Sequence, residues 1–129
     1  MKTRILVVDD EALVREVLGA ALGSEGYAVG FAASGEEAIR ALGPGSAIDL
    51  VVLDWRMPGM DGAGVLRAMA GIAERPPVIL LTGAVDEELA EIGKTGCAPA
   101  AVLRKPIHLA DLFSTVASVM SGVRRPAQP

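Results

Sequence analysis

The sequence predicts a single α/β domain in which a parallel β-sheet is covered by helices on both faces. Three observations support this fold class: short unbroken apolar runs, stretches of helical periodicity between them, and five alternations of the two within 129 residues. Strand–helix alternation with short connections implies right-handed crossovers and therefore parallel strands. The length and the 51% hydrophobic content are typical of one folded domain and exclude intrinsic disorder.

Strands are predicted where Val, Ile and Leu form unbroken runs bounded by polar or turn residues. The three strongest runs are residues 5–8, 50–53 and 78–81. Continuous apolar runs of this length are typical of strands that are buried on both faces. Two weaker runs, 28–33 and 100–103, are rich in small residues. We expect these two to be edge strands, with helix as the alternative.

Helices are predicted between the strands, where apolar residues recur at spacings of three and four. The five stripes are Leu13, Val14, Val17, Leu18, Ala21 and Leu22; Ala38, Ile39 and Leu42; Val65, Leu66, Met69 and Ile72; Val85, Leu89 and Ile92; and Leu109, Leu112, Phe113, Val116, Val119 and Met120. Gly23 is expected to end the first helix. Ser34 and Glu37 have capping-box spacing at the start of the second. The fourth helix has a narrow apolar face and an acidic flank that includes Glu88 and Glu91.

Charge and composition exclude several classes of function. Twelve basic and sixteen acidic residues give a net charge of −4, and the chain has only four aromatic residues. Direct nucleic-acid binding is therefore not expected, because it depends on basic patches and stacking aromatics. A single cysteine excludes an intrachain disulfide. No apolar segment is long enough for a signal peptide or a membrane span, so we expect a soluble, cytoplasmic protein.

Charged side chains follow the predicted strands at their carboxyl ends, where open α/β sheets form their sites. The first strand is followed by Asp9 and Asp10, and the third by Asp54. Two carboxylates about 5 Å apart repel each other by roughly 3 kcal/mol at an effective dielectric constant near 20. Lys105, after the fifth strand, cannot balance three acids. A hard divalent cation such as Mg²⁺ takes oxygen ligands and suits this group.

An acidic metal site beside a hydroxyl and a lysine is suited to handling a phosphoryl group. Thr82 follows the fourth strand, and together with Lys105 it could contact phosphoryl oxygens. A carboxylate can act as the nucleophile, with an aspartyl phosphate as the product. The residue types do not indicate which aspartate is phosphorylated.

Four segments, each at the end of a predicted strand, resemble the receiver domain of two-component response regulators. In order they are LVVDDE, VVLDWRMPGMDG, ILLTG and LRKPI. The resemblance extends to about Met120, so we expect the receiver domain at 1–121 and a flexible tail or linker stub at 122–129. It implies a flavodoxin-like (βα)5 fold with strand order 2-1-3-4-5 and a cis peptide bond before Pro106.

The resemblance also assigns roles to residues of the acidic cluster. Asp54 would be the phosphoacceptor. Asp10 and Asp54 would bind Mg²⁺ through their side chains, with Asp9 acting through water and the carbonyl of Arg56 as a backbone ligand.

Two further roles come from the resemblance, together with one departure from the family pattern. Thr82 would be the switch hydroxyl, and Lys105 would bind the phosphoryl group. The position three before the lysine usually carries Tyr or Phe, which moves inward on activation. Here it is Val102, a small β-branched residue that cannot act as this aromatic gate.

The resemblance implies a phosphoacceptor switch that takes its phosphoryl group from a histidine kinase or histidine phosphotransfer protein. Downstream contacts would involve the fourth helix, fifth strand and fifth helix, with no turnover of an external substrate. Two alternatives within the family are a degenerate receiver that binds partners without phosphorylation and a fragment of a longer regulator or hybrid kinase. Outside the family, an aspartyl-phosphate hydrolase is disfavoured because the first strand lacks an Asp-x-Asp pattern and no cap domain is predicted.

Overall fold

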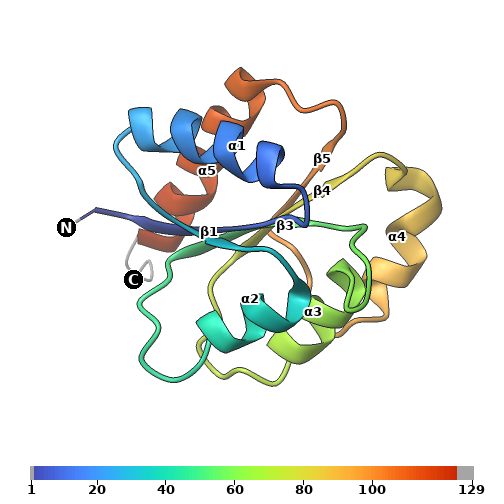
Figure 1. Cartoon of the computed structure of the whole chain (residues 1–129). Coiled ribbons are helices and arrows are strands. Elements are labelled where there is room, and N and C mark those ends of the chain that lie inside the picture. Colours follow the sequence, from blue (N-terminus) through green and yellow to red (C-terminus); the bar gives the residue numbers. More distant parts are fainter. Residues whose placement is uncertain (1, 125–129) are drawn as a thin grey trace.

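A computed structural model describes residues 2–124 as a five-stranded sheet with helices on both sides (Figure 1). The strand order is β2-β1-β3-β4-β5 and every neighbouring pair is parallel, which confirms the predicted fold class and topology. The elements are β1 (Arg4–Val8), α1 (Ala12–Ser24), β2 (Ala28–Ala32), α2 (Gly35–Ala41), β3 (Leu50–Asp54), α3 (Gly62–Met69), β4 (Val78–Thr82), α4 (Val85–Gly93), β5 (Ala101–Arg104) and α5 (Leu109–Arg124).

Burial separates the central strands from the edge strands. Every residue of β3 and β4 is buried, whereas β2 and β5 are partly exposed. The two runs rich in small residues are therefore the sheet edges, as predicted. The unbroken Val, Ile and Leu runs lie in the centre, where helices cover both faces.

Two hydrophobic layers hold the helices against the sheet. Helices α1 and α5 cover one face, and α2, α3 and α4 lie toward the other (Figure 1). Alternate strand residues supply the two layers, because successive side chains of a strand point to opposite faces. In β3, for example, Val51 and Leu53 pack toward α2 and α3, while Leu50 and Val52 pack toward α1 and α5.

Local signals at the helix ends are confirmed in one case and corrected in two. The Ser34 hydroxyl accepts a hydrogen bond from the Glu37 amide at 3.1 Å, so the predicted cap begins α2. Helix α1 does not end at Gly23. It continues to Ser24, and the turn is made by Gly26 with a φ of +95°. Helix α3 ends at Met69, before the predicted stripe residue Ile72.

Helix α5 is the longest of the described helices, with 16 residues. It continues to Arg124, three residues past the domain boundary predicted at 121. The rest of the predicted tail, 125–129, lies outside the described residues. The peptide bond between Lys105 and Pro106 is cis, as the resemblance implied. Within residues 2–124, no helix combines the length and apolarity needed to cross a membrane.

Four residues predicted in the apolar stripes are exposed instead. Leu13 is 69% exposed, Leu89 52% and Val17 50%, and Leu109 is also at the surface. The buried side of α1 is formed by Leu18 and Leu22, one edge of the predicted stripe. A helix that rests on a sheet buries only the side that faces the sheet, so apolar residues at the border of the stripe stay exposed.

Candidate functional site

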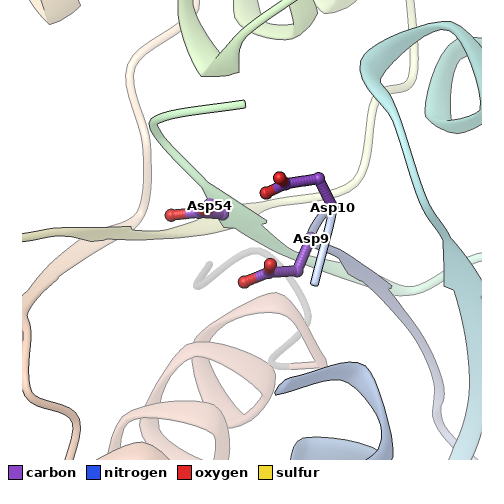
Figure 2. A group of neighbouring side chains, drawn as sticks. All are labelled: Asp9, Asp10 and Asp54. Carbon is purple, nitrogen blue, oxygen red and sulfur yellow. The ribbon is translucent and has the colours of Figure 1, made fainter. Parts of the chain in front are cut away.

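The sheet register brings the three predicted acids together at the carboxyl edge. Strands β1 and β3 are neighbours with Val8 opposite Leu53, so Asp9 and Asp54 follow at adjacent positions. One carboxylate oxygen from each of Asp9, Asp10 and Asp54 lies within 4.8 Å of the other two. Figure 2 shows the three side chains gathered at the carboxyl ends of these strands. This proximity depends on chain topology, because 43 residues separate Asp10 from Asp54.

Asp9 continues the ladder of β1 and is held in place by its own backbone and side chain. Its amide donates to the Ala32 carbonyl at 3.1 Å, and the residue is 1% exposed. Its Oδ1 accepts a hydrogen bond from the Glu11 amide at 2.9 Å, and its carbonyl accepts one from Arg15 Nη1 at 2.7 Å. These contacts fix the carboxylate toward Asp54 before any ligand binds.

Burial is the main reason why the pKa of Asp9 is raised above its ordinary value of 3.8. The negative charges of Asp54 and Asp10 add to this rise, while the Glu11 amide and the Lys105 ammonium oppose it. Desolvation and neighbouring anions both disfavour a carboxylate. The surroundings of Asp9 therefore favour its neutral form, and a nearby cation would favour the ionised carboxylate.

Lys105 contacts the aspartate at the end of β3. Its Nζ lies 2.6 Å from Asp54 Oδ1, and Asp54 is 3% exposed. The Lys105 amide donates to the Thr82 carbonyl at 2.9 Å, which extends the β4–β5 pairing and directs the lysine back over the sheet edge. A charge-assisted hydrogen bond of this length fixes one carboxylate oxygen. One ammonium does not balance the three carboxylates.

The donor set fits a hard divalent cation. Asp9, Asp10 and Asp54 each offer a carboxylate oxygen, the ligand type that Mg²⁺ prefers. Asp10 is exposed while Asp9 and Asp54 are buried, so the group is open to solvent on one side. This opening suits Mg²⁺, which keeps several waters when it binds to proteins.

Thr82 and Glu88 form a buried pair beside this site. The Thr82 hydroxyl donates to Glu88 Oε1 at 2.6 Å and accepts a hydrogen bond from the Ala84 amide at 3.2 Å. Thr82 is 2% exposed and Glu88 7%. Thr82 thus lies at the carboxyl edge as predicted, but its proton is directed to a residue of α4.

The loop after β3 carries Arg56 over the same edge. Gly62 anchors this loop: its amide donates to the Trp55 carbonyl at 2.8 Å, and an added Cβ would lie 2.8 Å from Trp55 Cα. The Arg56 side chain is mostly exposed, and its Nε lies 3.8 Å from Glu88 Oε1. The role of the Arg56 carbonyl as a metal ligand stays a prediction.

Val102 lies where the family pattern has an aromatic residue. It pairs with Leu80 in the β4–β5 ladder and packs against the core on the α2, α3 and α4 side of the sheet. Strand alternation places Thr82 on this same face, two residues beyond Leu80. On this face, the Thr82 hydroxyl contacts Glu88, which belongs to helix α4 and not to β5.

Glu88, next to the site, is the buried residue that sequence reasoning missed. The acidic run at the start of α4 indicated a solvated flank, whereas the structure buries Glu88 and exposes Glu91 and Leu89. Helical spacing contained the signal, because Glu88 precedes the buried Ile92 by four positions and so shares its face.

An apolar groove borders the acidic cluster on the side of α1. Leu13, Val17 and Leu109 line it together with Asp9 and Lys105. Three of the exposed large apolar residues of the molecule thus gather next to the acids, and contiguous exposed apolar surface is typical of protein contacts.

Comparison with known proteins gives a consistent result. Residues 5–117 match the sequence profile of the response regulator receiver domain. The transcriptional regulatory protein AruR of Pseudomonas aeruginosa is 36% identical over 128 residues, which is 96% of this chain and 52% of that protein. A protein-glutamate methylesterase/protein-glutamine glutaminase of Myxococcus xanthus is 37% identical over 96% of this chain and 36% of its own length. The chain thus spans about half or less of these curated relatives.

A solved structure supports the same grouping. The receiver domain of a sensor histidine kinase from Pseudomonas aeruginosa, with a magnesium ion coordinated in its active-site cleft, superposes with a TM-score of 0.83. The two chains are 27% identical, and the match covers 94% of this chain and 99% of that one.

Proposed function

The chain belongs to the response regulator receiver domain family, the phosphoacceptors of two-component signalling, and we propose that its phosphoacceptor is Asp54. The observation that carries this proposal is the 2.6 Å contact between Lys105 and Asp54 inside a group of three acids. Asp54 alone combines a place in the carboxylate cluster with contact to the lysine. Asp10 and Asp54 would bind Mg²⁺ through their side chains, with Asp9 acting through water and the Arg56 carbonyl as a further ligand.

The proposed reaction transfers a phosphoryl group from a phosphohistidine to Asp54. A carboxylate oxygen of Asp54 forms a bond to phosphorus, the P–N bond breaks, and its electron pair returns to the imidazole nitrogen. Lys105 is positioned to neutralise the phosphoryl oxygens. Thr82 would donate a hydrogen bond to one of them once its hydroxyl leaves Glu88. A bound magnesium ion would supply further positive charge to these oxygens.

We propose that residues 1–121 act as a switch and do not turn over an external substrate. The phosphodonor would be a histidine kinase or histidine phosphotransfer protein. Downstream contacts would use α4, β5 and α5, where Leu89 exposes half of its surface. The two curated relatives have different names and functions, a transcriptional regulator and a methylesterase, so the output is not transferred from them.

A second candidate function is a degenerate receiver that binds its partner without phosphorylation. Val102 favours it, because this side chain cannot act as the family's aromatic gate. The geometry of the acids and Lys105 favours the phosphorylated switch instead, because a site without phosphorylation has no need to keep three carboxylates and a lysine together.

The first experiment treats the protein with acetyl phosphate and Mg²⁺ and measures its intact mass. We expect one added phosphoryl group, which is absent in Asp54→Asn and absent when a chelator removes the metal. Asp111→Asn, at an exposed aspartate in the first turn of α5, serves as the matched control and should be modified like the wild type.

Absence of the adduct from the folded wild-type protein would favour the degenerate receiver. Beryllofluoride, a stable mimic of the phosphoryl group, distinguishes this outcome from a short-lived adduct, because it would still bind to a functional site. An adduct that persists in Asp54→Asn would exclude Asp54 as the acceptor.

A further inference from the structure

The Thr82 hydroxyl is already engaged in the unphosphorylated protein. A hydroxyl has a single proton to donate, and this proton is directed to Glu88 Oε1 over 2.6 Å. The Ala84 amide fixes the oxygen from the other side at 3.2 Å. Both side chains are buried, so water does not readily replace either partner. Thr82 therefore cannot donate to a phosphoryl group on Asp54 while it donates to Glu88.

The partner of Thr82 belongs to a surface helix, α4, and not to the sheet. The β5 residue on the same sheet face, Val102, is too small to act as a gate and packs into the core. Glu88 lies in the middle of α4, a helix of nine residues. A change in its hydrogen bonding therefore acts directly on the helix.

We propose that Glu88 takes the place of the missing aromatic gate and couples phosphorylation of Asp54 to the position of α4. In the unphosphorylated protein, Glu88 accepts the Thr82 hydroxyl and holds α4 against the end of β4. Phosphorylation draws the hydroxyl toward the phosphoryl oxygens, and Glu88 loses its donor. This inference rests on Asp54 being the phosphoacceptor.

The electrostatics at the site support release of Glu88. A phosphoryl group on Asp54 adds negative charge near a buried carboxylate that has just lost a hydrogen bond, and like charges repel more strongly where water is excluded. Glu88 also contacts Arg56, whose Nε lies 3.8 Å from Glu88 Oε1 and whose side chain is mostly exposed to solvent. An outward movement of Glu88 keeps this ion pair and removes the carboxylate from the new charge.

Hydrogen–deuterium exchange of the α4 amides, with and without beryllofluoride in the presence of Mg²⁺, tests this inference. In the wild type we expect beryllofluoride to speed exchange in α4 several-fold. Glu88→Met, of similar length but without an acceptor, should exchange rapidly in both conditions. Glu88→Gln keeps an acceptor oxygen for Thr82 and should retain the response. Glu91→Gln, an exposed glutamate of the same helix, controls for loss of charge.

Adduct formation tests the proposed function, and the response of α4 tests the coupling through Glu88, so the two can fail independently. Intact mass after acetyl phosphate treatment should still show the adduct in Glu88→Met, because the acceptor and Lys105 are unchanged. An adduct without any α4 response in the wild type would overturn the coupling, as would a wild-type response in Glu88→Met. If Glu88→Gln and Glu88→Met lose the α4 response equally, the hydrogen bond between Thr82 and Glu88 does not transmit phosphorylation to α4. Failure to form an adduct in the wild type would contradict the proposed function itself.

Discussion

The two sides of Asp54 differ in how their charges are arranged. Toward β1, Asp9 and Asp10 place two more carboxylates within 4.8 Å, and the side chain of Asp9 accepts from a backbone amide. Toward β4 and β5, the polar side chains contact one another, Lys105 with Asp54 and Thr82 with Glu88. The first side accumulates negative charge, whereas on the second side each of these polar side chains has a hydrogen-bond partner.

The two sides of Asp54 are therefore expected to respond differently when a ligand binds. The three carboxylates of the β1 side repel one another, so a bound cation would stabilise this side. The β4–β5 side is satisfied as it stands, so a ligand there must replace existing hydrogen bonds. A ligand that contacts both sides would be stabilised by the carboxylates of the β1 side and would replace hydrogen bonds on the β4–β5 side. The free energy of binding can in this way favour a different conformation.

The largest effect is expected from removing the positive charge of Lys105 on the β4–β5 side. Lys105→Met should slow the formation of the acetyl phosphate adduct by about 100-fold at saturating Mg²⁺, because a positioned positive group stabilises charge in the transition state. The initial rate of adduct formation by intact mass is the measurement. Lys94→Met, at the exposed C-terminal end of α4, is the control and should react at the wild-type rate. An unchanged rate in Lys105→Met would show that this lysine does not stabilise the transition state.

A smaller effect is expected on the acidic side. Asp10→Asn should weaken Mg²⁺ binding about tenfold or more and raise the metal-free free energy of unfolding by about 1 kcal/mol, because it removes one of three repelling charges. Mg²⁺ affinity can be followed by the fluorescence of Trp55, the single tryptophan, next to Asp54. Urea unfolding measures the stability.

Glu74→Gln is the matched control for this prediction, since it neutralises an exposed acid before β4, at the opposite edge of the sheet. It should change neither quantity. Unchanged or lower metal-free stability in Asp10→Asn would show that the three carboxylates do not repel one another significantly in the folded protein.

The smallest effect is expected in the pH dependence of stability. The pKa of Asp9 is raised in the folded protein, mainly by burial, so the native state binds its proton more tightly than the unfolded state does. Ionisation of Asp9 therefore lowers stability as pH rises from about 4 through the folded pKa. In urea unfolding without metal, the stability difference between Asp9→Asn and the wild type should grow in favour of Asn over this range.

Saturating Mg²⁺ should reduce this pH effect, because a cation favours the ionised carboxylate. A stability difference that is independent of pH, or one that grows toward low pH, would contradict the raised pKa and the repulsion among the carboxylates of the β1 side.

Much of the fold and of the site could be predicted from local features of the sequence. The buried strands were visible as unbroken apolar runs such as 50–53, and the start of α2 as the Ser34 cap. The acids at the strand ends were identified because parallel strands bring their carboxyl ends to a single edge. The motifs at the ends of four of the strands then predicted the family, which the comparisons show.

The sequence by itself determined which residues form strands and helices and which chemical groups follow the strands, because hydrophobic periodicity depends on neighbours along the chain. Only the tertiary structure decided how the surface helices are rotated against the sheet. Leu13 and Leu89 are exposed and Glu88 is buried, since the rotation of a helix depends on contacts with distant strands. For Glu88 this contact is the Thr82 hydroxyl, a partner on β4 that the acidic run of α4 did not reveal.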